Sequence, residues 1–221
     1  MGNDGTSIHY DEAYFAWQSL VGRFGGKANA FKFSRSVKPT DTVIDFGCGG
    51  GFLLKEIECA RRIGIEPNTS AHDQITANDV RPFGSQHECL AELGEGIADV
   101  IISNHALEHS LNPMQEIKAL MPLLKKGGTM HFLVPCDNIS VGWKPGDMHF
   151  HLYSWSPMNL GNLFTEAGYT VKEAGSLVHK WPPGYLQIQK IFGWKLFHLC
   201  CRLYGRLERS WFQSEVIATK Q

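Results

Sequence analysis

Residues 43–52 read VIDFGCGGGF, and this stretch decides the fold. A short apolar run that contains Asp45 leads into a glycine-rich turn, and a helical pattern begins at Leu53. This order predicts a buried strand, a tight turn and a helix. Glycines at such a turn let the main chain approach a ligand closely and leave N–H groups pointing at it. We therefore expect a ligand site where this strand ends.

Two common ligands of glycine-rich turns do not suit this one. A dinucleotide turn that begins with Gly47 and Gly49 needs its third glycine at position 52, which is Phe52. The phosphate-loop pattern G-x-x-x-x-G-K-[ST] is absent from the sequence. A nicotinamide-dependent dehydrogenase is therefore disfavoured.

The pattern that remains, D-x-G-C-G-x-G from Asp45 to Gly51, resembles the first motif of class I S-adenosylmethionine-dependent methyltransferases. Three later stretches fall where that family has its landmarks: a short strand that ends in Glu66, an apolar strand over 98–103, and a glycine turn and strand over 123–135. The resemblance covers roughly residues 40–175. It implies an α/β, Rossmann-like fold with a seven-stranded methyltransferase sheet, which is mostly parallel with an antiparallel last strand and has helices on both faces.

The resemblance also implies S-adenosylmethionine as the cofactor and assigns residues to it. The predicted contacts are Asp45, Gly47, Cys48, Gly49, Gly51, Glu66 and Asn104. Glu66 ends the second strand, where an acid can accept both ribose hydroxyls, as in NAD enzymes about 20 residues past their first glycine. Asp45 is expected to organise the loop and the cofactor's ammonium group, and Cys48 to pack as a small residue. Glu88 is the only nearby acid for the adenine amino group.

Ten histidines are candidates for a general base, because the unperturbed pKa of histidine is near neutrality. His105 follows the fourth strand and is expected near the sulfonium end of the cofactor. Glu108 and His109 either brace the loop or border the acceptor pocket. His151 precedes a helix over 157–167, as a histidine does in many relatives, and is either a base or acceptor contact or a structural hydrogen-bond partner. We predict His151 and His105 as the catalytic residues.

The same histidines raise the question of a metal. Residues 105–109 read HALEH, the H-x-x-E-H pattern of inverted zinc proteases, which needs both histidines on a helix and a third ligand downstream. His149 and His151 would point to one side of an extended segment, where two nitrogens can bind a metal. The sequence shows no convincing third ligand, so no metal site is predicted.

Composition suits one enzyme domain. The chain has 221 residues, of which 43% are hydrophobic, enough for the core of an α/β sheet. The net charge of −1 argues against general binding to nucleic acid. The six cysteines have no C-x-x-C spacing, which favours reduced thiols. No apolar leader or membrane-length apolar run is present, so we expect a cytoplasmic protein.

The predicted domain has four parts: an N-terminal helical cap over 1–40, a core over 41–175, a helical insertion over 176–213 and a final strand over 214–221. In the cap we expect a helix over 10–20, a break at 24–27 and a short helix over 28–34. In the core we expect strands over 42–46, 63–66, within 83–88, over 98–103 and 128–134, and near residue 170. The expected core helices lie over 51–62, 70–78, 114–123 and 157–167.

The insertion combines apolar and basic residues at helical spacing over 181–212. Its five basic residues are opposed by a single acid, Glu208. Three roles remain open: a cover over the substrate pocket, a surface for a homodimer, or peripheral contact with an anionic membrane.

Together these features predict an S-adenosylmethionine-dependent methyltransferase that acts on a small-molecule or glycan-type acceptor, at an oxygen atom. The alternative is a catalytically silent protein that keeps this fold for binding or scaffolding. The intact glycine turn and Glu66 argue against that alternative. The sequence does not identify the acceptor.

Overall fold

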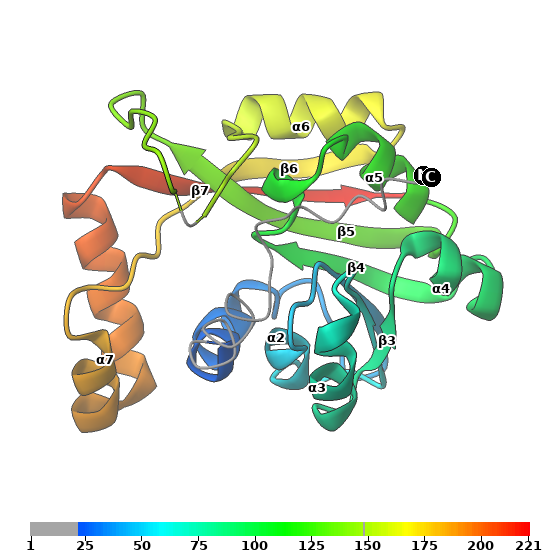
Figure 1. The fold of residues 1–221 in the computed structure, drawn as a ribbon, viewed down its shortest axis with the longest axis horizontal. Helices are drawn as coiled ribbons and strands as arrows, with labels where there is room; N and C mark the ends of the chain where they lie inside the picture. Colours follow the sequence, from blue (N-terminus) through cyan, green and yellow to red (C-terminus); the bar gives the residue numbers. More distant parts are fainter. Residues whose placement is uncertain (1–21, 148) are drawn as a thin grey trace.

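The computed structural model of the protein describes residues 22–147 and 149–221. In this part of the chain seven strands form one sheet, in the order β3-β2-β1-β4-β5-β7-β6 (Figure 1). The strands are β1 (Thr42–Phe46), β2 (Arg61–Ile65), β3 (Arg81–Phe83), β4 (Ala98–Asn104), β5 (Leu124–Asp137), β6 (Thr170–Leu177) and β7 (Trp211–Thr219). Only β7 runs antiparallel to its neighbours, β5 and β6. The predicted sheet is confirmed.

Helices cover both faces of this sheet, as predicted. The helical elements of the described residues are a helix through 22–29, η1 (Ala30–Lys32), α2 (Phe52–Lys55), η2 (Thr69–Ala71), α3 (His72–Ala77), α4 (Gln86–Leu93), η3 (Leu107–His109), α5 (Pro113–Leu120), α6 (Pro157–Glu166) and α7 (Tyr185–Leu207). Buried side chains of α4, α5 and α6 form one core cluster with the sheet, and those of α2 and α3 form another. Figure 1 shows α5 and α6 above the sheet and α2 and α3 below it.

The two central strands are buried because they are almost continuously apolar. Val43 and Ile44 of β1 and Ile101 and Ile102 of β4 have no exposed surface. β1 and β4 pair in parallel, so their carboxyl ends lie at the same edge of the sheet. Open parallel sheets bind ligands at that edge. The glycine turn after β1 and the polar residues after β4 are therefore neighbours.

Local sequence signals account for the ends of several elements. The Ser156 side chain accepts a hydrogen bond from the Asn159 N–H, and Pro157 occupies the first turn of α6. The predicted helix over 157–167 is confirmed. Ser85 caps α4 in the same way, through the Glu88 N–H. The third strand therefore ends at Phe83, and its predicted location within 83–88 is wrong for all but its first residue.

The predicted helix over 51–62 is also wrong, because α2 is a single turn. The side chain of Arg62 donates hydrogen bonds to the carbonyl oxygens of Leu54 (3.1 Å) and Ile57 (2.9 Å). These bonds satisfy carbonyl groups at the end of the turn, where a longer helix would use its own N–H groups. The chain then enters β2 at Arg61, two residues earlier than predicted.

The break predicted at residues 24–27 does not occur, because residues 22–29 are helical. A Cβ atom at Gly26 would overlap the main-chain carbonyl of Phe52. The glycine therefore allows close packing of this helix on the turn after β1 rather than ending it. The helix predicted over residues 10–20 lies outside the described residues.

One long helix, α7, lies within residues 176–213, where an insertion is predicted, and it has non-helical backbone angles at Gly193 (φ 75°). Phe197 and Cys201 are its most buried side chains and pack against Ala28 and a set of aromatic rings. Figure 1 shows α7 beside the sheet rather than on one of its faces. Among the described residues, no helix is long and apolar enough to span a bilayer.

Candidate active site

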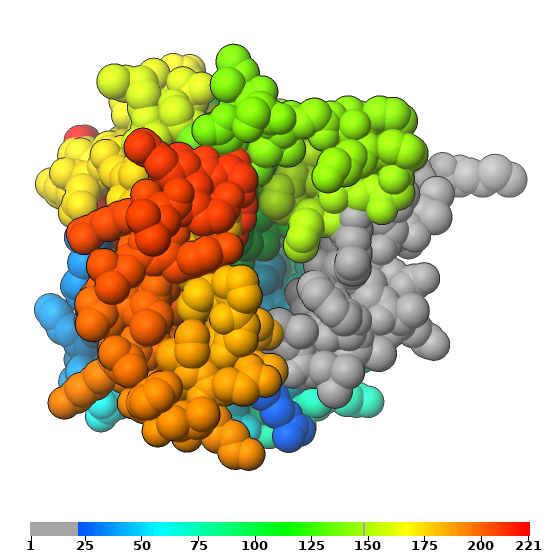
Figure 2. All heavy atoms as spheres, turned by 90° about the vertical axis from the view of Figure 1, so that its left-hand side faces the viewer, coloured from blue at the N-terminus to red at the C-terminus, as the bar shows by residue number. Residues whose placement is uncertain are grey.

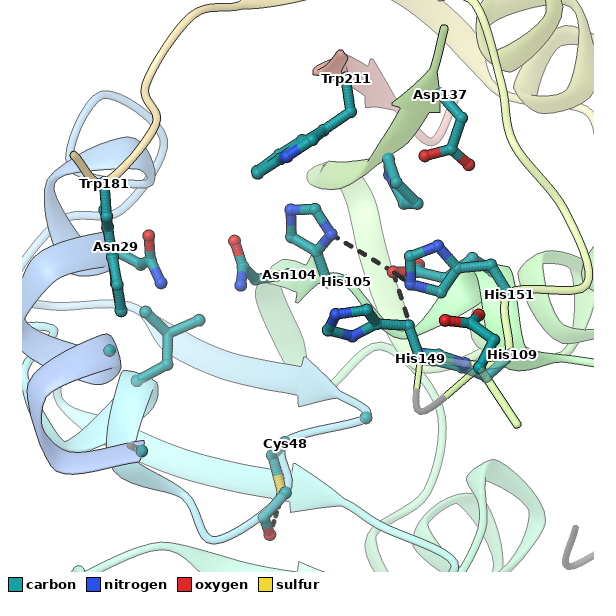
Figure 3. A pocket seen from close by; sticks show the side chains of 18 of the residues that line it. Asn29, Cys48, Asn104, His105, His109, Asp137, His149, His151, Trp181 and Trp211 are labelled. Atoms are coloured by element: carbon teal, nitrogen blue, oxygen red, sulfur yellow. Dashed lines mark hydrogen bonds and ion pairs between the residues drawn. The ribbon is translucent and has the colours of Figure 1, made fainter. Parts of the chain in front are cut away.

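A cavity of about 730 Å³ opens at the carboxyl ends of β1, β4 and β5 (Figure 3). Its walls come from four places: the glycine turn after β1, the segment after β4, the loop after β5, and the helix over 22–29 with Trp181. Figure 2 shows the hollow between the loop after β5 and the segment before α7. Residues more than a hundred positions apart thus share one wall.

The glycine turn forms one end of this cavity. Gly47, Gly49 and Gly51 have φ values of 71°, 53° and 74°, a conformation that favours glycine. The N–H groups of Gly47 and Cys48 donate to the Ile65 carbonyl oxygen, at 2.9 and 3.3 Å, which fixes the turn against β2. A Cβ atom on Gly47 would overlap that of Ala106, just after β4. The turn is therefore packed tightly between β2 and the end of β4.

Five of the seven predicted cofactor residues line the cavity: Asp45, Gly47, Cys48, Gly49 and Asn104. Gly51 does not, because it begins α2 and lies against Ile75 and Val80. Glu66 does not line it either. Its carboxylate accepts hydrogen bonds from the N–H groups of Gly49 (2.9 Å) and Asn68 (3.0 Å), so it stabilises the glycine turn. Each carboxylate oxygen can accept more than one hydrogen bond, so the predicted ribose contact of Glu66 stays a prediction.

Two buried groups at the cavity wall have perturbed acidities. Burial, together with the charge of Glu66, raises the pKa of the Asp45 carboxyl well above its usual value. Burial also raises the pKa of the Cys48 thiol, so this group remains protonated at neutral pH. The Cys48 sulfur packs on Gly64, where an added Cβ would lie 2.5 Å from it. The geometry agrees with a packing role for Cys48.

A buried lysine, Lys32, supports two residues of the cavity wall from outside the lining. Lys32 Nζ donates to Gln213 Oε1 (2.6 Å) and lies 3.4 Å from Asn104 Oδ1. Burial lowers the pKa of Lys32 to about 7. Gln213 Oε1 also lies 3.3 Å from His105 Nε2. This network positions Asn104 and His105. It was not predicted from the sequence, because a single lysine in a short helix does not indicate such a role.

The other end of the cavity is a cluster of histidines around Glu108, hereafter the histidine cluster: His105, Glu108, His109, His149 and His151 (Figure 3). Glu108 has no exposed surface. Its Oε1 atom lies 3.3 Å from His105 Nδ1, 3.9 Å from His109 Nε2 and 4.0 Å from His151 Nε2. The rings of His149 and His151 are 5.6 Å apart. The two predicted catalytic histidines, His105 and His151, thus lie within 4.0 Å of the same carboxylate oxygen.

Electrostatics in the histidine cluster follow from burial. Burial alone would raise the pKa of Glu108, but the contact with His105 and the nearby His109 bring the pKa below its usual value. Burial lowers the pKa of both His109 and His151, against the opposing effect of Glu108. At neutral pH these two imidazoles are therefore mainly uncharged. An uncharged imidazole can accept a proton or bind a metal.

Further residues of this wall were not predicted from the sequence. Asp137 ends β5 and lines the cavity, as do Asn29, Trp181 and Trp211. Asp137 carried a usable signal, since an acid at the end of a parallel strand faces the same edge as Asp45 and Asn104. Glu88, the candidate for adenine, lies on α4 with Oε2 2.6 Å from the Gly84 nitrogen and is not among the lining residues.

Comparison with known proteins identifies the family. A sequence-family model described as a methyltransferase domain matches residues 10–174, most of the chain. The chain belongs to the class I S-adenosylmethionine-dependent methyltransferase family. This membership assigns both the enzyme class of the methyltransferase and its cofactor.

Individual relatives of this methyltransferase are distant. The ubiquinone biosynthesis O-methyltransferase of Parvibaculum lavamentivorans is 25% identical over 162 residues, which cover 63% of this chain and 64% of the relative. That of Ruegeria pomeroyi is 30% identical over 97 residues, 39% of this chain and 38% of the relative. The chain thus spans less than two thirds of either relative. A crystal structure of a SAM-dependent methyltransferase from Aquifex aeolicus has a TM-score of 0.64 at 14% identity, covering 96% of this chain and 100% of that one, which shows a shared fold.

The residues of the cavity fit the cofactor of this methyltransferase family. The glycine turn brings main-chain atoms to the wall without side chains, so a ligand can approach them closely. The N–H groups of Gly47, Cys48 and Gly49 already donate to Ile65 and Glu66, so these three residues contribute close approach rather than hydrogen-bond donors. The buried acid Asp45 suits an ammonium group, because a nearby positive charge favours its ionised form.

Proposed function

We propose that the chain transfers a methyl group from S-adenosylmethionine to an oxygen atom of a small-molecule or glycan-type acceptor. One observation carries the proposal: the glycine turn and the histidine cluster lie at two ends of one cavity. A methyl donor held at the first end would present its reactive group toward imidazoles at the second. Family membership supports the donor, and the site geometry supports the position of the acceptor.

At the donor end, Asp45, Gly47, Cys48, Gly49 and Asn104 contact the cofactor, with Gly51 and Glu66 shaping the turn. When bound, the cofactor supplies a methyl group already activated by a sulfonium. The protein's task is alignment, which can contribute about 7–11 kcal/mol by holding two reactants in attacking geometry. The tight packing of Gly47 against Ala106 serves this task, because it couples the position of the turn to the segment that carries His105.

At the acceptor end, His105 and His151 are the candidate bases. An acceptor hydroxyl loses a proton as it attacks, and a positioned base typically contributes about 10²–10⁴-fold. Glu108 lies within 4.0 Å of both imidazoles and stabilises the positive charge that either gains on taking the proton. Trp181 and Trp211 supply apolar walls for the rest of the acceptor.

The choice of oxygen has one further support. The two relatives compared above are named O-methyltransferases. Their acceptors do not transfer to a chain that is so distant in sequence, and the small-molecule or glycan class rests on the size of the cavity, about 730 Å³. A cytoplasmic location, no partnership with nucleic acid, and contact of α7 with a membrane surface or a second copy remain parts of the same proposal.

Isothermal calorimetry with S-adenosylmethionine, followed by a turnover assay, tests the proposal. We expect one cofactor to bind per chain, and S-adenosylhomocysteine to be released when a panel of hydroxylated acceptors is supplied. His105→Gln and His151→Gln should lower kcat on the acceptor that is found, with cofactor affinity nearly unchanged. His87→Gln, an exposed histidine on α4, is the matched control. Absence of cofactor binding would refute the proposal, and binding without turnover of any acceptor would favour a silent binding protein.

A further inference from the structure

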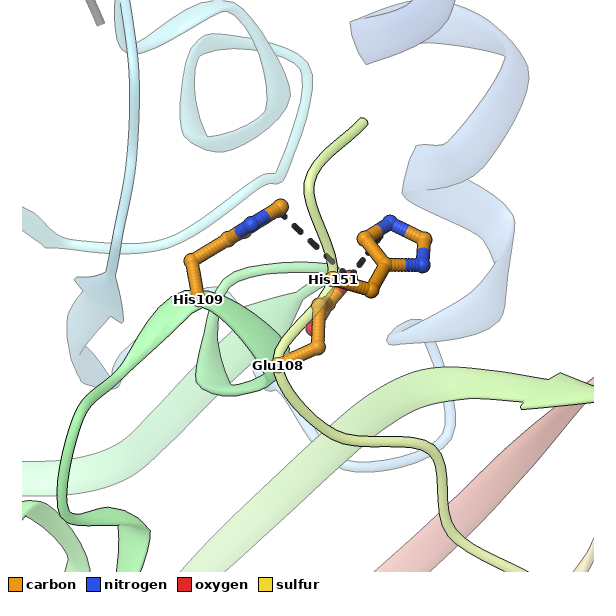
Figure 4. A group of neighbouring side chains, drawn as sticks. All are labelled: Glu108, His109 and His151. Carbon is orange, nitrogen blue, oxygen red and sulfur yellow. Dashed lines mark ion pairs between the residues drawn. The ribbon is translucent and has the colours of Figure 1, made fainter. Parts of the chain in front are cut away.

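We propose that Glu108, His109 and His151 form a binding site for a divalent transition-metal ion, such as Zn²⁺, at the acceptor end of the cavity (Figure 4). The three residues offer one carboxylate oxygen and two imidazole nitrogens within 4.8 Å of one another. The sequence alone predicted no metal. The structure changes that expectation because it adds His151 to the pair that is adjacent in sequence.

The state of Glu108 is the first argument. Its side chain has no exposed surface, and neither carboxylate oxygen receives a hydrogen bond of acceptable geometry from the described residues. The closest group, His105 Nδ1, is an ion-pair contact at 3.3 Å. Buried carboxylates are normally hydrogen-bonded, paired or coordinated to a metal. A dication at this point would compensate both oxygens at once.

The donor set is the second argument. Two imidazoles and one carboxylate are the ligands of several catalytic zinc sites, which keep a further position open for water or substrate. Imidazole nitrogen suits Zn²⁺ and other first-row transition metals, whereas Mg²⁺ and Ca²⁺ prefer ligand sets made of oxygen. The mixed set therefore favours a transition metal over the alkaline-earth ions.

The geometry needs only a local adjustment. Glu108 Oε1 lies 3.9 Å from His109 Nε2 and 4.0 Å from His151 Nε2. Ligand atoms about 2.0–2.2 Å from a zinc ion in a tetrahedral site lie roughly 3.3–3.6 Å from one another. Rotation of the imidazoles, mainly that of His151 in the loop after β5, closes the difference. The Leu152 N–H donates to the Glu108 carbonyl oxygen (2.9 Å) and already ties that loop to η3.

The site differs from the zinc-protease pattern that residues 105–109 resemble. In that pattern two histidines of one helix bind zinc and the glutamate acts as a base. Here η3 is a single turn, Glu108 is itself a ligand, and the third ligand comes from 42 positions further along the chain. His105 and His149 lie beside the three ligands, and Asp137 lines the same cavity. The open positions of the ion face this cavity. That they receive an acceptor oxygen rests on the proposed function.

Metal binding can be measured without any enzymatic assay. The purified chain is freed of metal with EDTA, titrated with Zn²⁺ by calorimetry, and titrated with Co²⁺ while its visible absorption is recorded. We expect one ion per chain and Co²⁺ bands of a four- or five-coordinate site. Glu108→Gln and His151→Ala should each weaken Zn²⁺ binding by at least a hundredfold and abolish those bands. His87→Ala, an exposed histidine away from the cavity, should leave both unchanged.

Each outcome decides the question. Absence of Zn²⁺ binding, or binding of equal strength in His151→Ala, would overturn the proposal, the second result by placing the ion elsewhere. His151→Ala changes a loop residue, so its circular dichroism should match that of the unaltered chain even if Glu108→Gln fails to fold. Calorimetry of S-adenosylmethionine with the metal-free chain tests the proposed function separately. Cofactor binding without metal binding removes the metal site alone, and the reverse removes the proposed function alone.

Discussion

Gly47→Ala tests the packing of the glycine turn, because the added methyl group should both destabilise the fold and disturb the site. The residue has a φ of 71°, and an added Cβ would overlap the Cβ of Ala106. Ala106 lies between His105 and Glu108 in the sequence. A displacement of Ala106 therefore disturbs the histidine cluster as well as the turn.

The expected loss of stability has two parts. A residue with a Cβ in the left-handed conformation costs roughly 1–2 kcal/mol. Carbon atoms pack at about 3.5–4.0 Å, so the overlap forces the turn and Ala106 apart, and overpacking of this kind typically costs about 1–3 kcal/mol. We expect a total decrease in the free energy of unfolding of about 2–5 kcal/mol. For a chain of this size each kcal/mol lowers Tm by about 2–4 °C.

Gly127→Ala separates the two parts. Gly127 has a φ of 75°, but an added Cβ there would meet no atom within 4 Å. This variant should lose only the first part, about 1–2 kcal/mol. Urea unfolding followed by circular dichroism measures both variants, and calorimetry measures S-adenosylmethionine affinity. We expect cofactor affinity to fall at least tenfold in Gly47→Ala and to stay unchanged in Gly127→Ala. Equal losses of stability in the two variants would refute the packing argument.

Three further predictions concern buried ionisable side chains. Burial raises the pKa of Asp45, so binding of S-adenosylmethionine, which carries a positive charge, should release a proton from this carboxyl. The binding enthalpy measured by calorimetry should then differ between buffers of unlike ionisation enthalpy. Asp45→Asn should remove most of that difference. Burial lowers the pKa of His179 to about 3. Between pH 7 and pH 5 the imidazole of His179 therefore takes up a proton only in the unfolded chain, so lowering the pH over this range should lower the free energy of unfolding by about 2 kcal/mol. In His179→Phe the free energy of unfolding, measured with urea, should depend less on pH by that amount. Glu215→Ala leaves the buried His131 without its carboxylate partner at 2.8 Å and removes a half-exposed contact with Arg35, so it should cost about 1–3 kcal/mol in the same assay. Glu173→Ala, which removes the exposed partner of that arginine, should cost less than about 1 kcal/mol.

The centre of the fold could be predicted from the sequence because its signals are local. The run from Val43 to Phe46 is apolar enough to be a buried strand, and the glycines after it can adopt the left-handed angles that the turn requires. Parallel strands place their carboxyl ends at one edge, so Asp45 and Asn104 were expected to meet there, and both line the cavity.

Element lengths and side-chain directions were less accessible, because they depend on contacts between separate segments. Arg62 ends α2 with hydrogen bonds that no periodicity in the helix could reveal. The direction of Glu66 was equally hidden. Its place at the end of β2 was predicted, yet its two oxygens take main-chain N–H groups of Gly49 and Asn68.

The histidine cluster shows why the chemistry of such a site emerges only in three dimensions. An α-helix over 105–109 would place the two histidines one turn apart on the same side, with Glu108 beside rather than between them. His105 instead has a φ of 58°, and only the turn of η3 follows it, so imidazoles on either side of Glu108 lie near its carboxylate. His151 lies near Glu108 because of the path of the chain after β5. This strand continues to Asp137, beyond its apolar run, and the loop that follows returns so that the Leu152 N–H donates to the Glu108 carbonyl oxygen. A base that removes a proton and a metal that holds an oxygen use the same imidazoles. Turnover and Zn²⁺ binding, compared between the unaltered chain and His151→Ala, therefore distinguish these two uses: loss of turnover in a chain that never bound Zn²⁺ indicates a base, and loss of both together indicates a metal ligand.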